Sequence, residues 1–168
     1  MSTVAVQRAS TPSTLTHNLY EYMNELYEKI AKRAFLLFEH DGRTHGHDVQ
    51  HWMEAEAEFL SPVLLEISET ETELTVRAEV PGFTEKEIEI VVEPGRLFIT
   101  GKAEKKTEDK RKKTLYSEIS SKEVFRSIAL PAEIDPDKVT ALLKNGVLEI
   151  SLHKAKPTKK APAAAKAA

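Results

Sequence analysis

Residues 73–83 read ELTVRAEVPGF and show the pattern on which the prediction of the fold rests. Apolar side chains occupy every second position from Leu74 to Val80, which is the repeat of a β-strand with one buried face. The Pro81-Gly82 pair that follows favours a turn, because proline lacks a backbone donor and glycine adopts backbone angles that other residues avoid. The stretch therefore predicts a strand that ends in a tight turn.

The same two-residue repeat starts at Ser61-Pro62 and continues to residue 153. The Asn145-Gly146 pair near its end predicts a tight hairpin, since both residues tolerate a positive φ. Seven or eight short strands, with no helix long enough to connect parallel neighbours, indicate a mainly β protein with an immunoglobulin-like antiparallel β-sandwich. The expected strands are Val63–Ile67, Glu73–Val80, Lys86–Val92, Leu97–Ala103, Thr114–Ile119, Val124–Leu130, Lys138–Leu143 and Val147–His153.

A helical pattern precedes the strands. Apolar residues recur there at intervals of three and four, which places them on one stripe of an amphipathic helix. After a turn rich in glycine, Asp48 is expected to cap a second helix. Residues 15–60 are therefore predicted to form a helical hairpin. The first stripe comprises Leu19, Tyr22, Met23, Leu26, Ile30, Ala34, Leu37 and Phe38.

The two ends of the chain have a different composition. Residues 1–14 are rich in Ser, Thr and Ala and predict a mobile arm, whereas residues 154–168 consist mainly of Lys, Ala and Pro and predict a disordered tail. The expected organisation is thus an arm (1–14), a helical hairpin (15–60), a sandwich domain (61–153) and a tail (154–168).

Charge and composition narrow the classes of protein. The net charge of −3 hides an acidic and a basic half. Residues 1–101 contain 8 Lys/Arg and 18 Asp/Glu, whereas residues 102–168 contain 16 Lys/Arg and 9 Asp/Glu. This asymmetry favours self-association. The chain has no cysteine, and neither a signal peptide nor an apolar run long enough to span a membrane is visible in the sequence. We therefore expect a cytoplasmic protein without disulfides or membrane contact.

Four ordered segments carry a resemblance to a known family: residues 74–83, residues 97–101, Leu130-Pro131 and residues 141–150 (ALLKNGVLEI). Together they resemble the α-crystallin domain of bacterial small heat-shock proteins, over roughly residues 62–153. The resemblance implies a homodimer, larger homo-oligomers, and an ATP-independent holdase that binds non-native client proteins and prevents their aggregation. It implies neither an enzyme nor a cofactor.

The family also implies a groove for clients or peptides between two strands. Mapped onto this chain, one side of the groove would carry Ile88, Ile90 and Val92, and the other Val139, Ala141 and Leu143. Alternation alone does not distinguish a residue that lines a groove from one in the ordinary sandwich core, so both interpretations stay open.

In the family this groove receives a C-terminal Ile-x-Ile segment, but residues 154–168 contain no Ile, Val or Leu. Val4-Ala5-Val6 has the same apolar-x-apolar form. One hypothesis is that Val4 and Val6 act as an N-terminal latch; the alternative is an unstructured terminus. The size of the oligomer stays open.

The resemblance further implies that the strand at residues 114–119 crosses to a partner subunit after the charged loop 104–113. Leu115, Tyr116 and Ile119 would then be buried at a dimer interface, and Arg126 would pair there with a carboxylate. An exposed flexible loop and a solvent-facing Arg126 are the alternatives. The strand exchange is favoured because an isolated apolar strand would leave an unprotected edge.

The helical hairpin resembles, over about residues 27–60, a short bacterial domain of unknown function, which implies no activity. Its histidines at positions 40, 45, 47 and 51 suggest zinc. Turn histidines are more often solvated or packed on a neighbour, so no metal site is assigned, although metal binding stays open.

A second class of function remains as an alternative. The basic loop and tail would allow a non-enzymatic scaffold protein to contact nucleic acid or anionic surfaces. Without aromatic residues between the lysines, specific nucleic-acid binding is not expected.

Overall fold

The computed structural model describes residues 2–8, 14–104 and 121–157 of the chain. The helices are α1 (Thr14–His40) and α2 (Asp48–Phe59). The strands are β1 (Ser2–Thr3), β2 (Val6–Arg8), β3 (Leu65–Glu69), β4 (Glu73–Glu79), β5 (Ile88–Glu93), β6 (Arg96–Glu104), β7 (Ser121–Ala129), β8 (Ile134–Lys144) and β9 (Val147–Lys154). The predicted strand Thr114–Ile119 lies outside the described residues.

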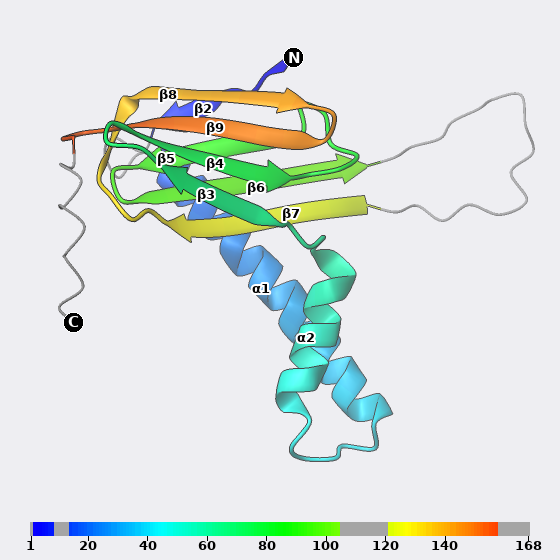
Figure 1. The fold of residues 1–168 in the computed structure, drawn as a ribbon. Coiled ribbons are helices and arrows are strands. Elements are labelled where there is room, and N and C mark those ends of the chain that lie inside the picture. Colours follow the sequence, from blue (N-terminus) through cyan, green and yellow to red (C-terminus); the bar gives the residue numbers. More distant parts are fainter. Residues whose placement is uncertain (1, 9–13, 105–120, 158–168) are drawn as a thin grey trace, which may run out of the picture.

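The strands form two sheets that face each other (Figure 1). The first sheet has the order β1-β8-β9-β4-β3, and the second has the order β2-β5-β6-β7. Paired strands are antiparallel except β2, which runs parallel to β5. The expectation of a mainly β sandwich after a helical hairpin is confirmed, with one parallel pair that the sequence did not predict.

The sandwich core follows from the two-residue repeat. In β4, Leu74, Val76 and Ala78 are buried, whereas Arg77 and Glu79, which flank Ala78, are exposed. Because side chains alternate across a strand, each apolar set faces the opposite sheet. The largest fully buried residues from the other strands of the core are Ile90, Val92, Leu97, Ile99, Ile134, Leu148, Ile150 and Leu152.

The predicted hairpin at Asn145-Gly146 joins β8 to β9. The φ angles of these residues are 51° and 76°, which is the left-handed pair that a two-residue hairpin requires. A Cβ on Gly146 would lie 3.2 Å from the Cα of Pro81, so this glycine also permits a close approach to the turn after β4. The Val80 amide donates to the Gly146 carbonyl at 2.7 Å.

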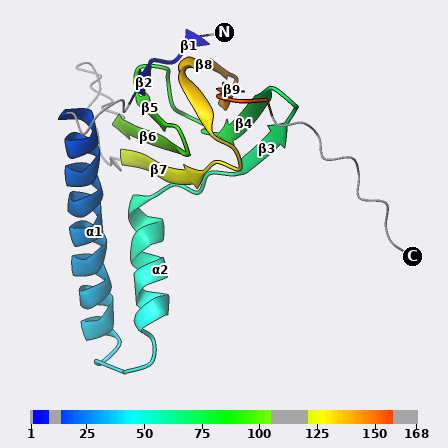
Figure 2. The same ribbon diagram turned by 90° about the vertical axis from the view of Figure 1, so that its left-hand side faces the viewer.

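The helical hairpin projects from the sandwich, and the first turns of α1 lie along the outer face of the second sheet (Figure 2). There Leu19 packs on Val91 and Phe98, which are buried although they point away from the sandwich core. The outer face of the second sheet therefore carries a local apolar patch where α1 covers it. Farther along, Leu26 and Ile30 pack on Ala55 of α2.

At the ends of three elements the structure differs from the expectation. Residues 2–8 are not a mobile arm but form β1 and β2, because their apolar side chains and backbone groups find partners on the sandwich. Lys154 is not part of a tail but the last residue of β9, where its buried ammonium group donates to Glu69 and to the Thr70 carbonyl. In the hairpin, Asp48 lies in the first turn of α2, and His47 rather than Asp48 is the N-cap residue.

Candidate functional site

The candidate site lies where β5 of the second sheet approaches β8 of the first. Both strands would be sheet edges without the N-terminal segment. In the structure, β1 pairs with β8 (Ser2 opposite Leu143) and β2 pairs with β5 (Val6 opposite Ile90). The segment Ser2–Arg8 therefore crosses from one sheet to the other and covers both edges, which otherwise would offer unpaired backbone groups to another chain.

The side chains that the sequence assigned to the groove lie together. Those on β5 and two of the three on β8 are buried, whereas Val139 is partly buried against the same cluster. This cluster is also the sandwich core, so the residues contact both the interior and the N-terminal segment. The set is Ile88, Ile90, Val92, Val139, Ala141 and Leu143.

Val4 occupies the seam between the two strands. Its side chain is 2% exposed and belongs to the sandwich core, and its amide donates to the Ala141 carbonyl at 3.0 Å. Ala5 is exposed and Val6 is half-buried against the core. The segment thus presents alternate side chains to the seam and uses its backbone as an additional strand, which is the geometry of an extended peptide bound at a sheet edge.

One ion pair holds the far end of this segment. The Arg8 Nη1 atom lies 2.5 Å from the Asp137 Oδ1 atom of β8, and both side chains are more than half exposed. An exposed ion pair of this kind contributes little to stability. The affinity of the segment for the seam therefore comes mainly from Val4, Val6 and the backbone pairing.

Of the residues assigned to a dimer interface, the structure describes only Arg126. It is exposed on β7, opposite Ile99 of β6. β7 is the outermost strand of the second sheet within the described residues. Leu115, Tyr116 and Ile119 lie outside the described residues.

A buried polar contact joins the hairpin to the sandwich, and sequence reasoning missed it. Glu123 of β7 is 7% exposed, and the Tyr22 hydroxyl donates to its Oε2 atom at 3.2 Å. Burial and the neighbouring Glu123 carboxylate raise the pKa of Tyr22 well above its usual value. The Ser61 amide also donates to the Glu123 carbonyl at 2.8 Å. A charged residue in a strand is normally expected to face solvent. The sequence therefore contains no signal that predicts this contact.

Among the described residues, large exposed apolar side chains are more numerous on the hairpin than on the sandwich. On the sandwich, the exposed large apolar residues are Leu64, Ile67 and Leu142. On the hairpin they are Tyr20, Tyr27, Phe35, Leu36, Val49 and Met53. In the part of the chain that the structure describes, neither helix is both long and apolar enough to cross a membrane.

Two parts of the chain match the sequence models of known protein families. Residues 66–166 match the model of the Hsp20/alpha crystallin family, and residues 25–61 match a family described as a protein of unknown function (DUF2934). The chain is 37% identical over 89 residues to small heat shock protein C2 of Rickettsia felis, which covers 53% of this chain and 58% of the relative. It is 33% identical over 96 residues to a probable 15 kDa heat shock protein of Leptospira interrogans. This alignment covers 57% of this chain and 72% of the relative.

Two solved structures are similar to part of this chain. Heat shock protein 16.0 from Schizosaccharomyces pombe aligns over 60% of this chain and 94% of that one, with 27% identity and a TM-score of 0.49. The hspA protein from Xanthomonas axonopodis aligns over 60% and 98%, with 29% identity and a TM-score of 0.44.

Proposed function

Because the chain belongs to the Hsp20/alpha crystallin family, we propose that it is an ATP-independent chaperone of the cytoplasm, which binds partly unfolded proteins and prevents their aggregation. The observation that carries the proposal is the seam between β5 and β8, which is apolar, borders two sheet edges and is covered by a short N-terminal segment. Binding of this kind needs no catalytic group.

The seam holds a client by reversible burial. Removing apolar surface from water contributes about 25 cal/mol per Å², and an extended client strand also pairs its backbone with the edge of β8 or β5. Such binding requires no particular client sequence beyond an apolar side chain at the position of Val4. It therefore suits a protein that meets many different unfolded chains.

In this proposal the N-terminal segment is a latch that competes with the client. Val4 occupies the place that a client side chain would take, and its attachment to the same chain gives it a high effective concentration. The client binds when the latch leaves. The same segment from a second copy fits the seam equally well, which provides a route to the larger homo-oligomer.

We assign the homodimer interface to the edge of the second sheet that is opposite to β2. The strand at that edge is β7, and Arg126 is exposed on it. We assign Leu115, Tyr116 and Ile119 to the same interface, on the family resemblance of residues 114–119.

A second client-binding surface is assigned to the hairpin. Its exposed aromatic and aliphatic side chains, such as Tyr27, Phe35 and Met53, offer apolar surface without any displacement of the latch. In this view the hairpin makes the first, weak contact with a client, and the seam holds an extended segment.

The test is aggregation of a heat-labile enzyme, followed by light scattering without ATP at equal stoichiometry. Val4→Asp is expected to release the latch, because a carboxylate at a buried site without a partner is costly. It should lower the amount of chaperone needed for half-suppression by about twofold or more, and Ala5→Asp is the matched control at an exposed position.

The outcomes separate the parts of the proposal. If the full-length wild-type chain leaves aggregation unchanged, the chaperone function is wrong. If wild type suppresses aggregation and Val4→Asp equals Ala5→Asp, the function stands and the latch is wrong. The size of the assembly, measured by light scattering on the same samples, tests whether the latch also joins copies.

A further inference from the structure

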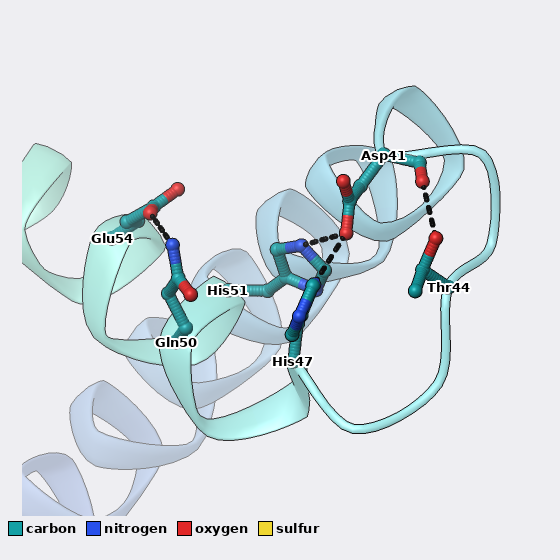
Figure 3. Close-up of polar contacts among 6 residues, drawn as sticks. All are labelled: Asp41, Thr44, His47, Gln50, His51 and Glu54. Carbon is teal, nitrogen blue, oxygen red and sulfur yellow. Dashed lines mark hydrogen bonds and ion pairs between the residues drawn. The ribbon is translucent and has the colours of Figure 1, made fainter.

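The tip of the helical hairpin brings three potential metal ligands together (Figure 3). Asp41 follows the last residue of α1, His47 is the N-cap of α2, and His51 lies in its first turns. The Asp41 Oδ2 atom is 2.8 Å from His47 Nδ1 and 3.3 Å from His51 Nε2. One ligand atom from each residue lies within 4.8 Å of the other two.

The second observation concerns His51, which is 6% exposed. Its ring packs edge-on against Phe38 at a centroid distance of 6.3 Å and against His47 at 6.0 Å. Its Nε2 atom faces the Asp41 Oδ2 atom at 3.3 Å, so this buried ring is directed into the cluster, whereas its Nδ1 atom is buried on the other side without a hydrogen-bond partner. The packing therefore fixes the His51 ring with one nitrogen directed at Asp41, which is the kind of orientation that a metal-binding histidine requires.

Two imidazoles converge on a single carboxylate oxygen in this arrangement. Each imidazole can only donate to that oxygen if it carries its proton on the nitrogen that faces Asp41. When those nitrogens are unprotonated, three lone-pair donors face one another, and a cation between them removes the repulsion. Two imidazole nitrogens with one carboxylate oxygen are a donor set that zinc and other divalent transition metals prefer over calcium or magnesium.

We propose that Asp41, His47 and His51 form a binding site for a divalent transition-metal ion, of which Zn²⁺ is the best-suited candidate. The inference does not depend on the proposed chaperone function. In a tetrahedral site with bonds of about 2.0–2.1 Å, neighbouring ligand atoms are about 3.3 Å apart. The contacts of the two histidines with Asp41 already have nearly this separation, so only small side-chain movements are required.

The surroundings leave the ion accessible from solvent. Asp41 and His47 are partly exposed, and the open pocket in front of them is also lined by His40, Gln50 and Glu54. Three protein ligands leave a fourth position for water or another oxygen, as in open zinc sites. The carbonyl end of α1 beside Asp41 adds a favourable partial charge for a cation.

The ion would connect the end of α1 to the start of α2. Asp41 and His51 lie on opposite sides of the turn, so coordination would close the hairpin at the point where it is farthest from the sandwich (Figure 1). Binding to the folded hairpin and not to the unfolded chain would stabilise the two helices by mass action.

The experiment uses the full-length protein without an affinity tag, after removal of metals by chelation. Co²⁺ is the spectroscopic probe, because its visible absorption reports coordination by nitrogen and oxygen, and Zn²⁺ is measured by competition. One ion per chain is expected. His47→Gln should weaken binding by about tenfold or more, and since His47 is partly exposed, this change should leave the fold intact.

His45→Gln is the matched control, because His45 is in the same turn and packs on Phe38 but is not in the cluster. Its affinity for Co²⁺ and Zn²⁺ should equal that of wild type. Zn²⁺ should also raise the unfolding midpoint of the hairpin, followed by the fluorescence of Trp52, in wild type and in His45→Gln but not in His47→Gln.

Three results would overturn the proposal. The first is the absence of stoichiometric Co²⁺ or Zn²⁺ binding by the wild-type protein at 1:1 mixing. The second is unchanged affinity in His47→Gln. The third is an equal loss in His45→Gln, which would mean that the ion binds loosely to surface histidines. In each case the three side chains would serve only to fix the turn by hydrogen bonds.

Discussion

The sandwich and the helical hairpin bury their apolar residues in different ways. In the sandwich, two sheets cover each other and many side chains are fully inaccessible, whereas the hairpin buries few residues between its helices and leaves large apolar ones exposed. The sandwich therefore depends on a large packed core, whereas the hairpin has a small apolar cluster and relies more on single polar contacts and on its support by the second sheet. Changes that weaken packing should act on the first region, and changes that remove single polar contacts should act on the second.

The largest effect is expected in the sandwich core. Leu148→Ala removes a side chain that is 0% exposed, and it should lower the free energy of unfolding by about 2–5 kcal/mol through lost burial and a cavity. Urea unfolding followed by circular dichroism measures this. Leu142→Ala, at a neighbouring position that is 37% exposed, should cost less than about 1 kcal/mol. Equal losses in the two variants would contradict a core built by alternation.

A smaller effect is expected where the hairpin meets the sandwich. Tyr22→Phe removes the hydrogen bond to Glu123 and leaves a buried carboxylate with one partner fewer, which should cost about 1–3 kcal/mol. The loss should appear mainly in the fluorescence of Trp52, which is the only tryptophan and lies in α2. Glu123→Gln, which keeps an acceptor for Tyr22, is the control and should lose less than Tyr22→Phe.

Tyr22 also makes the stability of the protein depend on pH. Because the folded-state pKa of Tyr22 is raised, its contribution to stability is complete below the pKa of an unfolded tyrosine and is lost as the pH rises through the folded-state value. In an alkaline titration followed by ultraviolet absorbance, one of the four tyrosines should ionise later than free tyrosine. That late step should be missing from Tyr22→Phe, and its persistence there would contradict the assignment.

The smallest effect is expected on the exposed side of the hairpin. Arg33 donates through Nε and Nη2 to the two carboxylate oxygens of Glu58, at 2.6 and 2.9 Å, and this pairing lowers the pKa of Glu58. Glu58→Gln should shift the Trp52 unfolding midpoint slightly downward at low salt and hardly at all at high salt, because salt screens exposed charges. Glu54→Gln on the same helix is the control. A shift that is independent of salt would contradict an electrostatic origin.

Much of the sandwich could be predicted because its signal is repeated. Alternating apolar residues are clearest in β4 and β9, and Asn145-Gly146 identifies a hairpin on its own. β1 and β2 have only two and three residues, too few to show a period, and their partners lie more than 80 positions away in the chain. Only the apolar-x-apolar form of Val4 and Val6 pointed to them.

Charged residues account for most of what the sequence did not predict. Glu123 and Lys154 are buried because each finds a partner that is distant in sequence, namely Tyr22 and Glu69. The contact of Val91 and Phe98 with α1 was also not predicted. These residues are next to inward-facing apolar residues on β5 and β6, so alternation does not separate the two faces there. The Tyr22–Glu123 contact depends on how the hairpin docks on β7, and the Lys154–Glu69 contact depends on how the ends of β9 and β3 meet in the first sheet. A local sequence pattern contains neither arrangement.

The length of α1 has a mechanical consequence. At 1.5 Å per residue its 27 residues form a continuous rod of about 40 Å. One end rests on the second sheet through Leu19, and the other carries the turn at Asp41. A small change in the angle between α1 and the sheet would displace the turn at the far end by a much larger distance. A fluorophore attached at the turn would therefore report sensitively on how tightly α1 is held against the sheet.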